Sequence, residues 1–456
     1  MYKRQLIDRD TGKPTKTIPF SDSPCDKDGA FQHLTQYGND VNGTLPPEVF
    51  ELLPSLVSVN LDPQGSDRIC TRSFEDEICG YASDYIITGS IPSEIGLCSQ
   101  LEYLSLDYQR LSGGLPANLG SLSLLKYLRL YDNKVTGEIS LAVGNTESLT
   151  LLDLGGNLLH GTIPSEIGLM SNLTSLDLSY TDLTGTIPSE IWRMPNLKRL
   201  CLDGTDLTGT IPTEIGLVSS LELLCLYYTD LTGTIPSEIW LMPKLTSLDL
   251  SGTNLTGTIP SEIGLMSKLT DLGLVDIGLT GTIPSEIGLM SSLEILFAGT
   301  DLTGTIPSEI GLMVILKHLY LTDSKLTGTI PSEIGLMSSL MWLSLSDTGL
   351  TGTIPSEIGL VTNSFFLDIS DTDLTGTIPS EILLTSNLLF LFISATDLTG
   401  TIPDGISELC VVATATMEER NGTVVWSLDG ATSVAQEVML WVHPNGTIEP
   451  SDCLYL

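Results

Sequence analysis

Hydrophobic residues recur along most of the chain in one repeated pattern. Each copy approximates L-x-x-L-x-L-x-x-T-x-L-T-G-T-I-P-S-E-I-G-L, and the copy that begins at Leu173 reaches its proline at Pro188. Within that copy Leu176 and Leu178 are separated by one polar residue, which predicts a short strand with one buried face. The other apolar positions find no partner inside a copy, so only stacking on neighbouring copies can bury them. The pattern therefore predicts a solenoid.

The proline of each copy measures the period and the extent of the array. It recurs every 24 residues, with one step of 23 residues from Pro284 to Pro307. Pro46 and Pro92 are 46 residues apart, so that copy holds an insertion at about 62–85. Counted by the first leucine-like position of each strand, the array has fourteen turns. A single solenoid is therefore expected instead of the several domains that the length would suggest.

The period is lost at both ends of the chain. We expect a lead and cap over 1–43, the solenoid over 44–403 and a C-terminal cap over 404–456. In the C-terminal cap the apolar segments 423–427 and 438–442 predict strands. Residues 1–43 lack the apolar run of a signal peptide, and no segment approaches the roughly 20 apolar residues of a membrane span.

Composition narrows the function classes. The chain has 456 residues, and 20 Lys and Arg against 56 Asp and Glu give a formal net charge of −36. This charge repels a polyanion, so we expect no nucleic-acid partner. With 41% hydrophobic residues the chain can bury a core, which excludes disorder. Each copy supplies Pro-Ser-Glu at the start of a short helical turn, where Glu is stabilising. The acidity is thus a property of the scaffold and does not by itself identify a cationic partner.

The repeat resembles the plant-type leucine-rich repeat of receptor ectodomains and polygalacturonase-inhibiting proteins, because L-x-G-x-I-P follows the strand pattern over roughly 44–403. The near-verbatim G-T-I-P-S-E-I-G array also resembles repeat proteins of diatoms and related algae. The resemblance implies an α/β solenoid, a right-handed leucine-rich-repeat superhelix. Its parallel sheet would line the concave side, a short second sheet one flank, and 3-10 or short helical turns the convex side.

The chain departs from the family at the position after the strand. The usual Asn survives at Asn133 and Asn157 and is otherwise mostly Thr. A Thr hydroxyl can bond the backbone of the adjacent turn, but it has fewer donors than Asn. Ile277 can make no such bond, so we expect a local weak point there.

The cysteines favour a disulfide-bonded protein. Six of the eight lie in or beside the caps, which is the habit of secreted leucine-rich-repeat proteins. The preferred pairs are Cys70–Cys79 and Cys410–Cys453, which leaves Cys25–Cys98. Cys201 and Cys225 are one repeat apart and would face outward on neighbouring strands. The strand spacing of about 4.8 Å is at the edge of disulfide reach, and we favour a reduced pair.

Glycosylation sequons agree with an extracellular or cell-surface location. They begin at Asn42, Asn172, Asn254, Asn421 and Asn445. The absence of a visible signal peptide stands against that location.

The chain carries no recognisable catalytic constellation. Its four histidines are scattered without H-E-x-x-H, and C-x-x-C, G-x-S-x-G, P-loop and kinase motifs are missing. We therefore expect no enzyme activity and no cofactor. Asp182, Asp206 and Asp230 repeat in one column and could share Ca²⁺. No known calcium repeat matches, so we interpret them as solvated acids and expect no metal site.

The residues that flank the buried leucines of each strand predict a recognition face on the concave side. They differ from copy to copy while the rest of the repeat barely changes, as a binding face can. In the C-terminal half they concentrate aromatic side chains, and a contiguous exposed apolar patch is typical of an interaction site. The candidate residues are Phe297, His318, Tyr320, Trp342, Phe366, Phe390 and Phe392, with Tyr103 and Tyr127 in a smaller cluster. The expected ligand is a protein, peptide or glycan. Alternatively, the rings pack against the C-terminal cap or shield the sheet.

A second hypothesis concerns the repeated T-G-T element. On a short strand both threonines would point away from Leu183 and Ile187, giving two files of Thr about 4.8 Å apart along the solenoid and about 6.7 Å across. Such an array resembles the T-x-T faces of β-solenoid antifreeze proteins and suggests binding to ice or mineral surfaces. The fold is not expected to require the second Thr, but S-E-I-G-L-M is just as invariant, so recent tandem duplication explains the threonines without selection for a surface. The candidates are Thr184, Thr186, Thr208, Thr210, Thr232, Thr234, Thr256, Thr258, Thr280, Thr282, Thr303, Thr305, Thr327, Thr329, Thr351 and Thr353.

Overall fold

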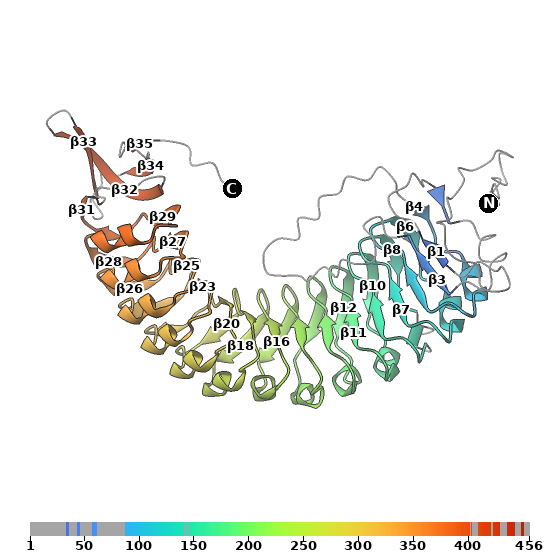
Figure 1. Cartoon of the computed structure of the whole chain (residues 1–456). Coiled ribbons are helices and arrows are strands. Elements are labelled where there is room, and N and C mark those ends of the chain that lie inside the picture. Colours follow the sequence, from blue (N-terminus) through green and yellow to red (C-terminus); the bar gives the residue numbers. More distant parts are fainter. Residues whose placement is uncertain are drawn as a thin grey trace. The chain divides into compact units, whose positions relative to one another are not determined.

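The structure is a computed structural model (Figure 1). It describes residues 33–35, 43–45, 57–61, 87–140, 143–144, 146–401 and 403, and the C-terminal segments 409–420, 423–428, 436–442 and 448–450. The chain divides into two compact units, Met1–Gly209 and Thr210–Leu456, here called the N-terminal and the C-terminal unit. The insertion expected at 62–85 lies outside the described residues.

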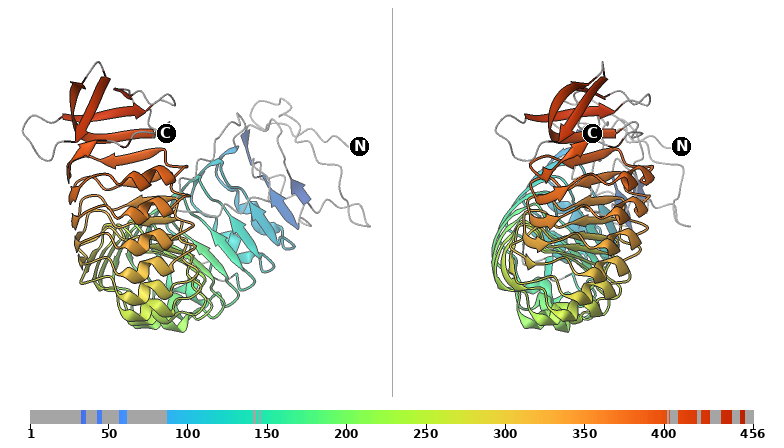
Figure 2. Two further views of the ribbon diagram at one scale, coloured as in Figure 1. Left: turned by 60° about the vertical axis from the view of Figure 1, so that its left-hand side comes forward. Right: turned by 90° about the vertical axis from the view of Figure 1, so that its left-hand side faces the viewer.

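One repeat shows how the sequence forms each layer. In β9 (Leu151–Asp153) the central Leu152 is buried while its neighbours are partly exposed. The chain then returns through β10 (Leu158–Thr162) on the flank and η4 (Ser165–Leu169) on the convex side. Pro164 precedes the 3-10 turn with extended backbone, and Glu166 occupies its first turn. Strands and 3-10 turns lie on opposite sides of each stack (Figure 2).

The N-terminal unit stacks these elements in parallel register. Its concave strands are β1 (His33–Thr35), β3 (Ser58–Asn60), β5 (Tyr103–Ser105), β7 (Tyr127–Arg129), β9, β11 (Ser175–Asp177) and β13 (Arg199–Cys201). The flank strands are β2 (Gly43–Thr44), β4 (Ile87–Gly89), β6 (Arg110–Gly113), β8 (Lys134–Gly137), β10, β12 (Asp182–Thr186) and β14 (Asp206–Gly209). The 3-10 turns include η1 (Ser93–Leu97), η2 (Ala117–Ser121), η4 and η5 (Ile191–Arg193).

The C-terminal unit repeats the arrangement. Its concave strands are β15 (Leu223–Cys225), β17 (Ser247–Asp249), β19 (Asp271–Gly273), β21 (Ile295–Phe297), β23 (His318–Tyr320), β25 (Trp342–Ser344), β27 (Phe366–Asp368) and β29 (Phe390–Ile393). The flank strands are β16 (Asp230–Thr234), β18 (Asn254–Thr258), β20 (Gly278–Thr280), β22 (Thr303–Gly304), β24 (Lys325–Gly328), β26 (Gly349–Gly352), β28 (Asp373–Gly376) and β30 (Asp397–Leu398). The 3-10 turns are η6 (Thr213–Leu217), η7 (Ser237–Leu241), η8 (Ser261–Leu265), η9 (Ser285–Leu289), η10 (Ser308–Leu312), η11 (Ser332–Leu336), η12 (Ser356–Leu360) and η13 (Ser380–Leu384).

A sheet of different topology follows the last repeat. Strand β32 (Leu409–Arg420) pairs in parallel with β29 and then antiparallel with β33 (Thr423–Leu428) and β34 (Gln436–Val442). Strands β31 (Gly400–Thr401) and β35 (Ile448–Pro450) complete it. The two strands predicted in the C-terminal segment are thus confirmed. The structure also confirms the predicted α/β solenoid, with parallel in-register strands and short 3-10 turns. Among the described residues, no helix is long and apolar enough to cross a membrane.

The position after each concave strand distinguishes early from late repeats. Asn133 accepts a hydrogen bond from the amide of Leu111 in the preceding repeat (3.0 Å) and donates to the carbonyl of Leu106 (2.9 Å). Thr348 instead donates within its own repeat, to the carbonyl of Leu345 (2.8 Å). The amide side chain therefore ties two repeats together, whereas this hydroxyl closes only a local turn. Gln109, which was not predicted to have this role, makes the same kind of contacts as Asn. Its side chain accepts from the amide of Ile87 (2.8 Å) and donates to the carbonyl of Leu61 (2.9 Å).

The flank sheet of the C-terminal unit is interrupted between β20 and β22. An isolated bridge between Ile277 and Thr300 stands in place of continuous pairing. The 23-residue repeat causes this, because Gly299 replaces the two residues that other copies place before the Thr. The second of those residues is left-handed in other copies, as at Asp323 with φ 50°. The weak point expected at Ile277 coincides with this interruption.

Candidate functional site

Aromatic rings form a continuous row on the concave strands of the C-terminal unit. We call this row the aromatic ladder; it consists of Phe297, Tyr320, Trp342, Phe366, Phe390 and Phe392. The rings of Trp342 and Phe366 stack with centroids 3.9 Å apart and planes at 18°. Those of Phe297 and Tyr320 stack at 4.4 Å and 25°. The ring centroids of Tyr320 and Trp342 are 5.8 Å apart, and this contact connects the two stacked pairs.

Strand register explains why these residues meet. Trp342 lies opposite His318 on one side and Phe366 on the other, and Phe366 lies opposite Phe390. The intervening Leu343 is buried, so the flanking positions must face outward. The prediction that adjacent strands place these aromatics together is confirmed. His318 also belongs to the group, although its side chain is buried and its ring centroid is 6.5 Å from that of Tyr320.

The ladder is half-buried and has an apolar edge. Its six rings are all partly exposed, and the indole N–H of Trp342 has no hydrogen-bond partner among the described residues. Phe365 packs edge-on against Trp342, with centroids 5.4 Å apart. Met341 and Leu389 occupy the same register position as Phe365 in the neighbouring repeats and are exposed. This edge was not predicted, because the alternation of the strand indicates only the residues on either side of the buried leucine.

The concave face of the N-terminal unit carries an ionic network. Arg129 pairs with Asp107 at 2.8 Å and lies 3.9 Å from Asp153. The side chain of Asp107 is fully buried and also accepts from the amide of Tyr131 (2.9 Å). Burial, and then the carboxylates of Asp177 and Asp107, raise the pKa of Asp153 well above its usual range, against the opposing charge of Arg129.

The two predicted tyrosines of this unit lie beside that network. The rings of Tyr103 and Tyr127 are 5.5 Å apart and tilted by 44°. They are positioned by β5 and β7, whose register also brings Ser105 opposite Arg129. These tyrosines therefore form a small cluster within the N-terminal unit.

The T-G-T threonines line the flank strands as predicted, and all sixteen candidates are exposed. The first hydroxyl of a copy donates to a glycine carbonyl of the preceding copy, as from Thr351 to Gly328 (3.3 Å). The methyl group of the second Thr packs on a glycine of the next copy. A Cβ at Gly376 would stand 2.9 Å from Cγ2 of Thr353. The second Thr therefore has a packing role that sequence analysis did not assign.

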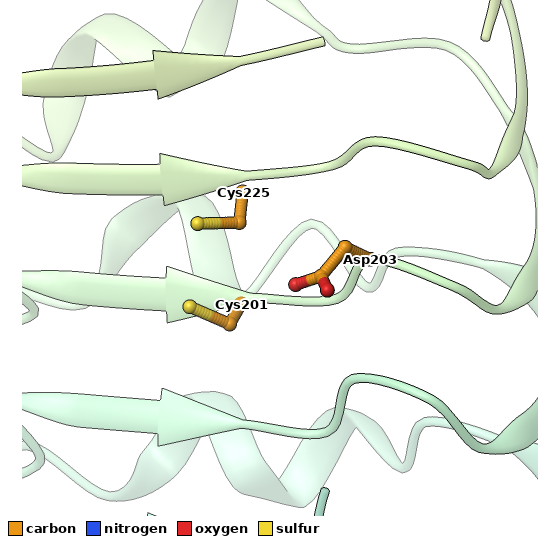
Figure 3. A group of neighbouring side chains, drawn as sticks. All are labelled: Cys201, Asp203 and Cys225. Carbon is orange, nitrogen blue, oxygen red and sulfur yellow. The ribbon is translucent and has the colours of Figure 1, made fainter. Parts of the chain in front are cut away.

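The described cysteines are buried. Cys201 and Cys225 end β13 and β15, and Asp203 follows β13 (Figure 3). Cys225 is a free thiol in this structure, and the reduced state expected for its pair with Cys201 stays a prediction. Burial raises the pKa of the Cys98 thiol to about 11. Its predicted partner Cys25 lies outside the described residues, so that pairing stays a prediction.

The remaining predicted modification sites are only partly covered. Cys70, Cys79, Cys410 and Cys453 have no described side-chain environment, and the same holds for Asn42, Asn421 and Asn445. Asn172 and Asn254 are exposed, and Asn172 donates to the carbonyl of Glu147 (2.8 Å). Glycosylation at these positions stays a prediction.

Comparison with known proteins agrees with this geometry. The family model described as Leucine Rich Repeat matches residues 148–170, 172–194, 244–266, 316–337 and 339–360. These matches show leucine-rich repeats in the chain and support the expected plant-type leucine-rich-repeat family. No curated protein matches this leucine-rich-repeat chain in sequence.

Solved receptor structures share the fold. The PEPR1–AtPEP1 complex is 30% identical with a TM-score of 0.75 over 84% of this chain and 51% of that one. The Arabidopsis receptor kinase HAESA, in complex with the peptide hormone IDA and the co-receptor SERK1, is 27% identical with a TM-score of 0.70. The match covers 86% of this chain and 63% of that one. The plant peptide hormone receptor RGFR1, in complex with RGF2, is 28% identical with a TM-score of 0.66. The match covers 82% of this chain and 65% of that one. This leucine-rich-repeat chain thus spans less than two thirds of the length of each of these three receptor chains.

Proposed function

We propose that this protein is a non-catalytic recognition protein outside the cell or at its surface, which binds a peptide or protein ligand through the aromatic ladder. The observation that carries the proposal is the unbroken row of rings from Phe297 to Phe392, partly exposed on the concave strands. Burying such rings contributes more to binding than most other side chains do.

The neighbours support the same reading. Structures similar to this chain include receptor ectodomains solved with peptide hormones. Their likeness makes a peptide or protein the favoured ligand. The ladder supplies a reason from this chain itself, because exposed apolar side chains gathered over adjacent strands are costly unless a partner covers them.

Selection from a random dodecapeptide display library tests the proposal. Peptides enriched on the wild-type protein should be lost on the double variant Trp342→Ser with Phe366→Ser. The matched control is Leu289→Ser with Leu312→Ser, which removes two exposed apolar side chains from the convex turns and should keep the enriched peptides. Circular dichroism and thermal midpoints establish that each variant is folded. Equal enrichment on both double variants, or none on the wild type, would overturn the proposal.

Surface binding by the threonine files is a second candidate. It is favoured by the regular spacing of exposed threonines on the flank strands, and it is weakened because both threonines already have packing partners in the scaffold. Thermal hysteresis and ice recrystallisation decide it. The variant Thr256→Lys with Thr280→Lys and Thr303→Lys should abolish ice shaping, and an intact protein that shapes no ice removes the candidate.

A further inference from the structure

We propose that the ligand of the aromatic ladder is an extended cationic peptide with apolar side chains, held between the rings and a parallel file of aspartates. This inference rests on the proposed function and adds the chemistry of the ligand. The aspartate file consists of Asp323, Asp347 and Asp371, each one repeat from the next.

The backbone fixes the aspartate file beside the ladder. Each aspartate follows the last residue of β23, β25 or β27 by three positions, so each of these strands carries both a ring and an acid. All three adopt left-handed backbone, with φ of 50°, 53° and 52°, and all three are exposed. Their amides donate to the next repeat, as from Asp371 to the carbonyl of Ser394 (2.9 Å). The carboxylates therefore stand in a row alongside the rings.

The aspartate file lacks a cation of its own. Among the described residues no ion pair involves these carboxylates, and the nearby Lys325 pairs with Asp301 instead (2.8 Å). Partial burial, followed by repulsion from Asp371, Asp323 and Asp368, raises the pKa of Asp347. A row of like charges this close repels itself, and a ligand with basic side chains would relieve that repulsion.

Ring stacking favours a peptide over a glycan. One face of Trp342 and one face of Phe366 cover each other at 3.9 Å, so these two faces are not open for a sugar to stack on. Ring edges and the exposed Met341 and Leu389 remain for contact. Edges carry the positive part of the ring quadrupole and suit carbonyl oxygens. The indole N–H of Trp342, which has no partner among the described residues, can donate to such a carbonyl.

The dimensions fit a short extended segment. From β21 to β29 the ladder crosses four strand spacings of about 4.8 Å, or about 19 Å. An extended peptide advances about 3.3 Å per residue, so about six residues span the rings. Long Lys or Arg side chains on such a segment can reach the aspartate file while apolar side chains rest on the ladder.

Calorimetric titration with four synthetic probes tests the inference. The probes are the hexapeptide (Lys-Leu)₃, its counterparts (Glu-Leu)₃ and (Lys-Ser)₃, and a linear gluco-hexaose. We expect (Lys-Leu)₃ to bind most tightly of the four probes, and we expect its affinity to fall as salt is added. The double variant Asp347→Asn with Asp371→Asn should weaken it roughly 2- to 30-fold and flatten the salt dependence. The matched control Asp373→Asn with Asp397→Asn removes two exposed flank acids and should change the affinity less than twofold.

Several results would overturn the inference. They are equal affinity for (Glu-Leu)₃, an equal loss in the flank control, binding of the hexaose alone, and no binding of any probe. The display selection separates this failure from that of the proposed function. If peptides that depend on Trp342 carry no excess of Lys and Arg, the ladder remains a peptide site and only its cationic ligand is wrong.

Discussion

The two units present the same backbone to the concave side but stabilise it by different chemistry. In the N-terminal unit Arg129 bridges buried carboxylates, and Asn133 and Asn157 tie successive repeats through their amides. In the C-terminal unit stacked rings line the concave strands, and the side-chain hydroxyl of a threonine such as Thr348 donates within its own repeat. The difference separates a face whose central charges pair with one another from one that leaves apolar surface and acids for a partner.

The largest effect is expected from removing the central cation of the N-terminal unit. Arg129→Met leaves the fully buried carboxylate of Asp107 without its ion pair, and should cost about 3–5 kcal/mol in urea unfolding. The control is Lys325→Met in the C-terminal unit, whose pair with Asp301 is mostly exposed, and it should cost about 1 kcal/mol or less. Equal losses in the two variants would refute the contrast.

The next effect concerns the side chain after the strand. Asn133→Thr should cost about 1–3 kcal/mol, because the amide of Leu111 loses its acceptor inside the core. Thr348→Val in the other unit removes a single bond to Leu345 and should cost about 0.5–1.5 kcal/mol. Hydrogen exchange at Leu111 gives the local check: protection there should fall only in the first variant.

A pH titration of stability sharpens the ionic side of the comparison. The raised pKa of Asp153 means that the folded state binds this proton more tightly than the unfolded state. Stability is therefore lost as pH rises from the usual carboxyl pKa of about 4 through the raised value. Asp153→Asn should raise the thermal midpoint at pH 7, with the gain vanishing below about pH 4. The exposed Asp182→Asn serves as control, and a gain that persists at low pH would contradict the assignment.

The smallest effect is expected on the flank. Thr351→Val removes an exposed hydroxyl that donates to Gly328 and should change stability by about 0.5 kcal/mol or less. Gly376→Ala is the contrasting variant, because it forces a side chain into left-handed backbone at φ 86° and against Thr353. Its larger loss, measured by the same unfolding assay, would show that the backbone conformation and close approach at Gly376 matter more to the flank than the hydrogen bond of the first Thr.

The sequence was sufficient for part of the candidate site. Period and alternation placed Trp342 and Phe366 beside a buried leucine, and the structure confirms their contact. Phe365 was missed, because the residue before a strand has no fixed direction in a period-two pattern. The acceptor role of Gln109 was missed too, because a longer amide at the Asn position breaks the motif while keeping its hydrogen bonds.

The sequence by itself determined the solenoid, its 24-residue period and which columns face outward, because stacking identical copies leaves one way to bury their leucines. Only the tertiary structure decided how neighbouring copies touch. Side-chain rotamers and the approach of adjacent repeats set whether rings stack, whether Arg129 reaches Asp107, and whether Asp347 lies within range of Asp371. These contacts join residues at least 22 positions apart, and no local pattern encodes their distance.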